Sequence, residues 1–523
     1  MLGLRRLSPA APTDRILQVG EAERPRAQPP SDVAPDEIER SLRRGAFWAL
    51  GSQIAVQVIR FGGVVVLARL LTPDEYGMAA IAVTLGSFSA ILGDLGYSMA
   101  VVQASSVSQR LASTACWCAL AAGVILSTCA ALGAYPAAQL LGEPEVTGLV
   151  MVGGLTLFLV ATGSTSKALL TRSMSFDVIQ SAGMAASVVA TVSAIAAAAM
   201  GAGAWALVLQ QVVLATVTSA LFILAARWRP SLEFARTAFR SLSKYALPIT
   251  GGHVFGILQP LVTVLLIGYL VGVEELGIWN LSMALVAVPV TLLAYPVAQV
   301  LYAAFARMRD DPERVAEVWL TGFTRLAAVV LPALFGLIAV APDLIPLAFG
   351  SQWVPAVPVV QILGVWIMSR SLQTWNNSVM DAAGKPHISM ILNATVLIAL
   401  PPSIWLGSAY GIEGVAVAFS LSALIFGELP SFVITTRQLG LGGLSVLSRL
   451  RGIALSSATA CIAVVLVRQV LEKAGVGVEL RLALSIMVGV AVYVPCLTLV
   501  ARDIATQLLQ MARGLRPVPR PGG

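Results

Sequence analysis

Two stretches of the sequence carry polar side chains at helical spacing inside otherwise apolar runs. In the first stretch, Gln53, Gln57 and Arg60 are separated by four and then three residues, which puts them on one face of a helix. In the second, Arg370 and Gln373 are three residues apart and share a face in the same way. A guanidinium group can bind phosphate through two parallel charged hydrogen bonds. Both stretches are therefore candidates to line a cavity that binds an anionic ligand.

Four more polar side chains are candidates for the same cavity. The internal repeat of the sequence aligns His253 with Gln53, and Gln259 follows on the same predicted helix. Arg325 lies about two turns into another apolar run, and Lys167 lies close to the end of one. Long basic side chains near a membrane surface also extend toward lipid head groups, and a histidine on an apolar helix is often a packing residue. Both kinds of role stay open for these four residues.

Three acidic residues, Asp94, Asp381 and Glu428, lie within or beside apolar runs. A charged group inside a bilayer costs about 2.5–3.5 kcal/mol on insertion scales, so such groups often mark a functional site. Each acid could exchange a proton, bind Na⁺ or pair with an arginine, and we favour a structural ion pair for Asp94 and Asp381. Glu428 precedes Leu429-Pro430, where an interrupted helix could expose carbonyl oxygens to a cation.

The elements that must position these groups are membrane-spanning helices. The 523 residues are 57% hydrophobic and 12% charged, with a mean hydropathy of +0.84. A soluble globular protein has about 45–50% apolar and about 25% charged residues. The composition therefore predicts a polytopic membrane protein, and it excludes a soluble enzyme, a nucleic-acid-binding domain and a secreted disulfide scaffold.

The net charge of +7 does not indicate a nucleic-acid partner, because an excess of Lys and Arg is typical of the cytoplasmic side of membrane proteins. All five cysteines lie in apolar runs, which favours buried packing roles over a disulfide framework. Two histidines are too few for a histidine metal cluster. We therefore expect no metal site and no cofactor, with H⁺ or Na⁺ as a possible coupling ion.

Fourteen apolar runs are long enough to cross a membrane, since a spanning helix needs about 20 residues. The expected spans are 46–68, 78–102, 111–134, 147–169, 178–200, 203–225, 245–271, 276–304, 319–341, 354–377, 388–409, 412–435, 452–471 and 481–501. Most of the 34 Lys and Arg fall in the segments on one side, and acidic residues collect in the opposite loops. This separation predicts that both termini are cytoplasmic.

The spans fall into two related halves. A shift of 200 residues aligns Gly51 with Gly251 and Gly77 with Gly277. Six spans separate the copies, so the repeat is parallel, with an axis along the membrane normal, as expected for alternating access. The predicted organisation is listed in chain order: a disordered cytoplasmic tail at 1–40, an N-lobe of helices 1–6 at 41–230, a C-lobe of helices 7–12 at 231–440, helices 13 and 14 at 441–502, and a cytoplasmic tail at 503–523.

Catalytic motifs are missing from the sequence. It contains no Gly-x-x-x-x-Gly-Lys-Ser/Thr loop for nucleotide phosphates. No predicted outer loop exceeds about a dozen residues, which leaves no room for an outer catalytic domain. We therefore expect a transporter that is not an enzyme.

Several short motifs resemble those of a known transporter family. They are Leu67–Gly77, Gly93–Tyr97, Arg309–Arg314, Phe349–Ala356, Ala383–Pro386 and Tyr410–Ala416. In their order and spacing, over roughly residues 41–440, they resemble the bacterial Wzx-type polysaccharide-transport flippases of the multidrug/oligosaccharidyl-lipid/polysaccharide exporter superfamily.

The resemblance implies fourteen helices in two lobes around a cationic cavity, in the bacterial cytoplasmic (inner) membrane. It implies a cargo of undecaprenyl-diphosphate-linked oligosaccharide for exopolysaccharide, capsule or lipopolysaccharide O-antigen, with Arg60 and Arg370 as the cavity cations. Export by alternating access would be coupled to an ion gradient. Glycosyltransferases and a polysaccharide polymerase would act beside the protein, and we expect a monomer surrounded by membrane lipids.

Other functions remain as alternatives. A drug exporter of the same superfamily would carry organic cations and should have acids deep in the cavity, where this sequence has arginines. A lipid II flippase would share the class of cargo, but the motifs match the polysaccharide branch better. A membrane glycan polymerase or ligase should have a large outer catalytic loop, and the sequence predicts none.

Overall fold

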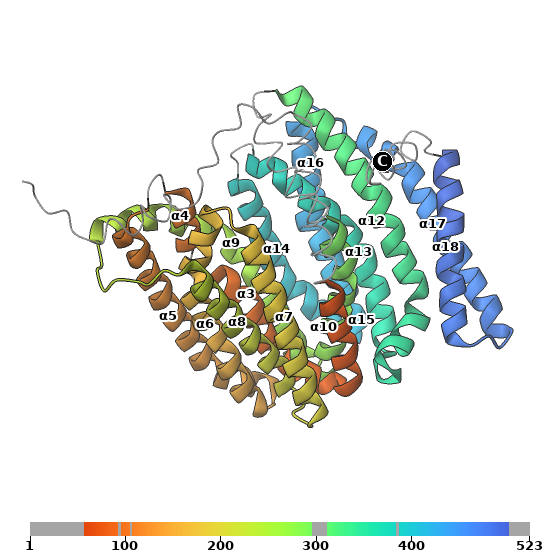
Figure 1. Ribbon diagram of the computed structural model, residues 1–523. Helices are drawn as coiled ribbons and strands as arrows, with labels where there is room; N and C mark the ends of the chain where they lie inside the picture. Colours follow the sequence, from red (N-terminus) through yellow and green to blue (C-terminus); the bar gives the residue numbers. More distant parts are fainter. Residues whose placement is uncertain (1–56, 93–95, 105–106, 295–310, 383–385, 501–523) are drawn as a thin grey trace, which may run out of the picture.

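The computed structural model describes residues 57–92, 96–104, 107–294, 311–382 and 386–500, and these residues form helices with no strand (Figure 1). The elements are a helical segment at 57–70, α3 (Pro73–Leu92), α4 (Tyr97–Gln103), α5 (Gln109–Leu141), α6 (Glu145–Arg172), α7 (Phe176–Ala199), α8 (Trp205–Ala226), α9 (Arg236–Leu270), α10 (Val273–Pro289), η1 (Val290–Ala294), α12 (Pro312–Phe349), η2 (Ser351–Trp353), α13 (Ala356–Ala382), α14 (Pro386–Ser408), α15 (Gly411–Ala423), η3 (Leu424–Glu428), α16 (Leu429–Gln438), α17 (Gly443–Lys473) and α18 (Val478–Val500).

Ten helices within the described ranges are long and apolar enough to cross a membrane, so the chain is a multi-pass membrane protein. Each of the fourteen predicted spans overlaps a helix or the described part of one. The remaining four are the segment 57–70, α3, α9 and α13, so the total of fourteen stays a prediction. The predicted tails, 1–40 and 503–523, lie outside the described residues.

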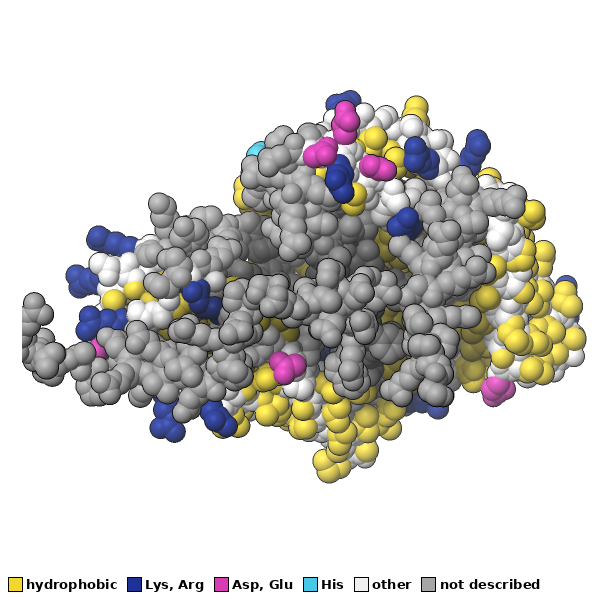
Figure 2. Space-filling view, turned by 45° about the horizontal axis from the view of Figure 1, so that its top comes forward, with side chains coloured by type: hydrophobic (Ala, Val, Ile, Leu, Met, Phe, Trp, Pro, Cys, Tyr) yellow, Lys and Arg dark blue, Asp and Glu magenta, His cyan; other side chains and the backbone are white. Residues whose placement is uncertain are grey.

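Charged side chains separate to the two ends of the bundle. Helices that begin at one end have acids in their first turn, such as Asp74 and Glu75 in α3 and Glu274 in α10, where the positive end of the helix dipole stabilises them. Basic residues gather at the other end, where α5, α9, α12 and α17 begin. Figure 2 brings that end forward and shows dark blue Lys and Arg side chains around its described rim, above apolar sides. The helix ends and turns at this end of the bundle contain Arg110, Arg172, Arg227, Arg229, Arg236, Arg240, Arg314, Arg437, Arg449 and Arg451.

The N-lobe packs through small residues. A Cβ added at Gly163 in α6 would lie 2.7 Å from the Cα of Ser219 in α8, and one at Gly153 would lie 2.6 Å from the Cβ of Ala82. Small residues let helix backbones approach closely, which is how helices gain packing energy in lipid. The N-lobe is therefore held together by close backbone contact.

The C-lobe packs through large aromatic rings. Trp319 and Phe323 of α12 are stacked with their ring centroids 4.7 Å apart. Phe419 of α15 contacts Trp366 edge-on at 5.0 Å and Trp279 at 5.1 Å. These rings join α10, α12, α13 and α15 into one core. The repeated halves thus share a helix order but use different side chains to pack it.

The two lobes meet where α3 crosses α10, its counterpart in the internal repeat. A Cβ added at Gly77 in α3 would lie 1.8 Å from the carbonyl oxygen of Val273, and one at Gly277 in α10 would lie 1.8 Å from that of Pro73. The two contacts mirror each other at the predicted offset of 200 residues. They are the contacts expected where a two-fold axis relates two parallel halves.

Two C-terminal helices, α17 and α18, pack against α12 at the edge of the C-lobe (Figure 1). The predicted span 319–341 ends before Asp343, but Asp343 lies within α12. Arg468 of α17 and Arg481 of α18 both pair with its carboxylate. Their mutual pairing allows charged residues to continue a helix that hydropathy alone would end.

Candidate functional site

The predicted polar face of α13 forms as expected at its centre. The Nη1 atom of Arg370 donates a 2.8 Å hydrogen bond to Oε1 of Gln373, one turn further along the helix. Gln373 is buried and Arg370 is half-buried. This bond fixes the orientation of the guanidinium on the polar face of α13.

Glu428 lies across from this face at the end of η3. Its side chain is 5% exposed, and it lies beside the Trp366 indole and within electrostatic range of Arg370. Its Oε2 atom has no hydrogen-bond partner among the described residues. The predicted interruption before Pro430 is a π-helical turn, and the chain continues as α16. π-helical turns are rare in proteins, and those that occur are often found at functional sites.

The first polar stretch divides between the two lobes. Gln57 donates a 2.8 Å hydrogen bond from Nε2 to Oγ1 of Thr291, which belongs to η1 of the C-lobe. Arg60 is exposed, and its Nη2 atom lies 3.4 Å from Oγ of Ser187 in α7. Gln57 is therefore part of the contact between the lobes, whereas Arg60 is oriented toward its own lobe.

Three other candidates are placed in other helices. Gln259 donates a 2.8 Å hydrogen bond to the carbonyl of Asn393 and so joins α9 to α14. Lys167 is exposed near the end of α6, and Arg325 is half-buried in α12. Two candidates, Gln53 and Asp94, lie outside the described residues. His253 lies in α9 and Asp381 in α13, and their side chains are also outside the described part of the structure.

Sequence reasoning missed a polar contact that joins the lobes beside the Gly77 crossing. Trp353 donates from Nε1 to the carbonyl of Ala68 at 2.7 Å, and Gln352 donates from Nε2 to Ala68 and Leu71. Arg69 donates in the opposite direction, to the carbonyls at the end of α12. We call Arg69, Gln352, Trp353 and the two crossing glycines the lobe seam. The short motifs around Arg69 and Trp353 were the available signal.

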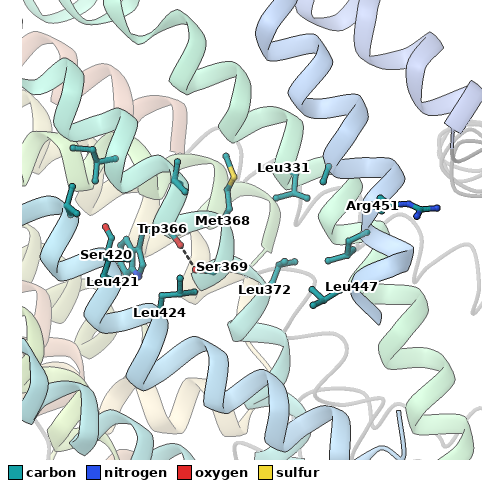
Figure 3. Close-up of a pocket in the computed structure, with 15 residues that line it drawn as sticks. Leu331, Trp366, Met368, Ser369, Leu372, Ser420, Leu421, Leu424, Leu447 and Arg451 are labelled. Atoms are coloured by element: carbon teal, nitrogen blue, oxygen red, sulfur yellow. Dashed lines mark hydrogen bonds between the residues drawn. The ribbon is translucent and has the colours of Figure 1, made fainter. Parts of the chain in front are cut away.

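An apolar cavity of about 690 Å³ lies between α12, α13, α15 and α17. Leucines from each of these helices line it, together with Trp366 and Met368 (Figure 3). Ser369 is turned back to the carbonyl of Trp366, and Arg451 stands at the edge with its guanidinium directed away from the centre. A cavity with this lining suits a hydrocarbon chain.

Comparison with known proteins identifies relatives along nearly the whole chain. Residues 66–358 match the family described as polysaccharide biosynthesis protein. The succinoglycan biosynthesis transport protein ExoT of Rhizobium meliloti is 26% identical over 508 residues, which is 94% of this chain and 99% of the relative. The lipopolysaccharide biosynthesis protein WzxC of Escherichia coli is 24% identical over 76% of this chain and 81% of its own.

Solved structures share the fold at low sequence identity. A lipid II flippase, MurJ, in an inward closed conformation has a TM-score of 0.67 at 13% identity, over 87% of this chain and 98% of its own. An inward-facing multidrug transporter of the MATE family has a TM-score of 0.54 at 13% identity, over 75% of this chain and 98% of its own. The chain thus shares its helical fold with these two proteins.

Proposed function

The chain belongs to the polysaccharide biosynthesis protein family, and on that premise we propose that it moves lipid-linked oligosaccharide units across the bacterial cytoplasmic membrane. The cargo is an undecaprenyl-diphosphate-linked repeat unit destined for exopolysaccharide, capsule or lipopolysaccharide. The protein turns this cargo from the inner to the outer leaflet as a transporter that catalyses no covalent step.

The observation that carries the proposal is the match to relatives named for polysaccharide synthesis and transport, one of them over 94% of this chain and 99% of its own. The chemistry of the chain supports the same cargo. A diphosphate requires cations within the membrane, and Arg370 lies half-buried on the polar face of α13. A prenyl tail gains about 0.8 kcal/mol for each buried CH₂, so it remains in lipid or in an apolar cavity while the head group crosses.

Export proceeds by alternating access of the two lobes and is coupled to an ion gradient. The basic end of the bundle faces the cytoplasm, as the excess of Lys and Arg there favours, and both termini lie on that side. The lobe seam then closes the outer side. We propose that the protein works as a monomer, because its two lobes already supply the facing halves, and that glycosyltransferases and a polymerase act before and after it.

Depletion of the protein tests the proposal. Lipid-linked oligosaccharide should accumulate at the inner leaflet, and wild type should clear it on re-expression. The Arg370→Ala and Arg60→Ala variants should fail to clear it at equal membrane abundance, whereas Arg240→Ala, at the basic rim, serves as the control for loss of a cation outside the spans.

A different outcome would overturn the proposal. If the lipid-linked pool and the surface glycan are unchanged while sensitivity to cationic drugs rises, the protein is a drug exporter. If both arginine variants clear the intermediate as well as wild type does, the assignment of these cations to the diphosphate is wrong even where the transport function stands.

A further inference from the structure

The linker between α8 and α9, residues 227–235, turns back along the first turns of α5 and forms the yellow-green loop at the left edge of Figure 1. α8 ends at Arg227, whose left-handed backbone, with a φ of 48°, turns the chain away from the helix axis. Ser231 then bonds to α5 through its main chain: its N–H donates to Oγ of Ser113 at 2.9 Å, and its carbonyl accepts from Nε1 of Trp117 at 2.9 Å. The linker is therefore a fixed part of the N-lobe surface.

Contacts with α5 alternate along the linker. Two residues after Ser231, Glu233 also contacts α5, where it accepts a 2.7 Å hydrogen bond from Nε of Arg110. Successive side chains of an extended segment point to opposite sides. Leu232 and Phe234, which alternate with these contacts, are therefore directed away from α5, and their exposed fractions are 91% and 53%.

A third apolar side chain joins them from the first turn of α9. Phe239 is 39% exposed, and its ring centroid lies 5.9 Å from that of Phe234. We call Leu232, Phe234 and Phe239 the linker patch. Exposed apolar side chains that gather on one part of a surface mark a contact with another protein or with a membrane.

Exposed arginines flank the linker patch along the chain. Arg227 and Arg229 precede it, and Arg236 lies within it at the start of α9. Within the described part of the chain, none of these three makes an ion pair, whereas the acid of the linker, Glu233, is already paired with Arg110. Figure 2 shows dark blue Lys and Arg side chains gathered at the left end of the molecule, where the linker lies. The positive charge around the linker patch favours an anionic partner.

The bonds to α5 also set the depth of the linker in a membrane. α5 has 33 residues and is about 50 Å long, whereas the hydrocarbon core of a bilayer is about 30 Å thick. Ser113 and Trp117, which hold the linker, lie about 6 and 12 Å from the start of the helix. These turns therefore lie at the level of the lipid head groups. Trp228 of the linker, which donates from Nε1 to Oε1 of Gln109 at 2.7 Å, fits this level, because tryptophan is enriched at membrane interfaces.

We propose that the linker binds anionic phospholipids: Arg227, Arg229 and Arg236 contact the phosphate groups, and the linker patch inserts between the upper parts of the acyl chains. A lipid surface matches both halves of this arrangement, since basic side chains beside exposed Leu and Phe are typical of segments that lie in the membrane interface. An acidic protein would match the charges but would have to reach the linker patch at head-group depth. The contact lies apart from the transport path and holds the N-lobe at a constant depth.

Lipid-dependent stabilisation of the purified full-length protein tests the charged half of the contact. The probe is phosphatidylglycerol, added to the protein in detergent, with phosphatidylcholine as the zwitterionic comparison. We expect the unfolding temperature to rise more with phosphatidylglycerol, and the difference to shrink in about 1 M salt, where the screening length falls to about 3 Å. Arg229→Gln and Arg236→Gln should each raise the half-maximal phosphatidylglycerol concentration about fivefold, which corresponds to about 1 kcal/mol for one basic side chain near an anionic surface. Arg314→Gln is the matched control, because Arg314 is also exposed at the basic end but lies on α12, and its response should equal that of wild type.

Cysteine labelling in lipid nanodiscs tests the apolar half. A membrane-impermeant maleimide should label Leu232→Cys several-fold more slowly in nanodiscs that contain phosphatidylglycerol than in pure phosphatidylcholine. Adding Arg229→Gln and Arg236→Gln to Leu232→Cys should restore fast labelling. The five native cysteines lie within α5, α17 and α18, and the wild-type protein gives their background. Met200→Cys is the control, because Met200 is 82% exposed at the opposite end of the N-lobe, and the arginine substitutions should leave its labelling unchanged.

Three results would overturn the inference. Equal stabilisation by phosphatidylglycerol and phosphatidylcholine would show that the linker does not select anionic lipid, and an acidic protein would become the better candidate. An equal loss in Arg314→Gln and Arg229→Gln would show that only the overall charge of the basic end matters. Equally fast labelling of Leu232→Cys in both kinds of nanodisc would show that the linker patch does not insert. None of these results depends on transport, so failure of the lipid contact and failure of the flippase proposal are separable.

Discussion

Two buried carboxylates of the C-lobe, Asp343 and Glu428, differ in whether they have an ion-pair partner. Asp343, 2% exposed, receives two hydrogen bonds from Arg481, at 2.6 Å to Oδ1 and 3.0 Å to Oδ2, and Arg468 lies 3.9 Å away. Glu428, 5% exposed, has no ion-pair partner within 4.0 Å in the described part of the chain, and one oxygen is unbonded.

The difference separates a structural charge from an available one. Asp343 lies on α12, and its two arginines come from α17 and α18, so the paired carboxylate fastens the C-terminal helices to the C-lobe. Glu428 lies at the end of η3, within electrostatic range of Arg370. Glu428 therefore stays a candidate for ion coupling, whereas Asp343 has a structural role.

Removing the charge of Asp343 should have the largest effect on stability. Asp343→Asn leaves two arginines without their shared anion, and breaking a buried pair costs about 3–5 kcal/mol. The unfolding temperature in detergent should fall strongly. An unchanged unfolding temperature would show that the pair contributes nothing and that the comparison has no energetic basis.

A subtler change at the same pair should have an intermediate effect. Arg481→Lys keeps the positive charge but cannot make two parallel bonds to one carboxylate, so we expect a loss of about 1.5–3 kcal/mol. Chemical unfolding of the purified variant measures this loss. If the loss is as large as in Asp343→Asn, the geometry of the fork matters more than the charge.

Neutralising Glu428 should change the stability in the opposite direction. Glu428→Gln removes a buried, incompletely paired charge, so the variant should be as stable as wild type or more stable, by up to about 1 kcal/mol. Chemical unfolding of the purified variant measures the difference. If Glu428→Gln is less stable than wild type, Glu428 is a structural residue like Asp343.

The exposed ion pair between Arg110 and Glu233 should contribute least to the free energy of unfolding. Arg110 and Glu233 are 2.7 Å apart, but their side chains are 73% and 57% exposed. Exposed pairs contribute about 0–1 kcal/mol, so Glu233→Gln should change the unfolding free energy by less than about 0.5 kcal/mol. A larger loss would show that burial is not what distinguishes Asp343.

Hydropathy and periodicity were enough to locate the helices and the polar face of α13. The spacing of Arg370 and Gln373 predicts that they share one face of a helix, and in the structure the two side chains are hydrogen-bonded on that face. Contacts between helices follow from packing, which periodicity does not encode. For this reason the sequence did not predict that Gln57 bonds to Thr291 across the lobes.

The ends of the helices were predicted wrongly for a related reason. A window of hydropathy stops at Asp343, although a carboxylate paired with Arg481 costs far less in lipid than an isolated one. The predicted span 319–341 therefore ends eight residues before α12 does. The role of the Trp353 motif was hidden in the same way, since its indole bonds to a backbone carbonyl that any residue would supply.

The crossing of Gly77 and Gly277 also limits how the two halves can diverge. Each glycine faces a main-chain carbonyl of the other copy, so a larger residue at either position clashes with the backbone. A mutation of a neighbouring side chain cannot relieve this clash. Second-site suppressors of Gly77→Leu should therefore be absent among neighbouring side chains. After a gene duplication, such a contact ties both copies to the same ancestral residue, even while the cores of the two lobes become alanine-rich in one and aromatic in the other.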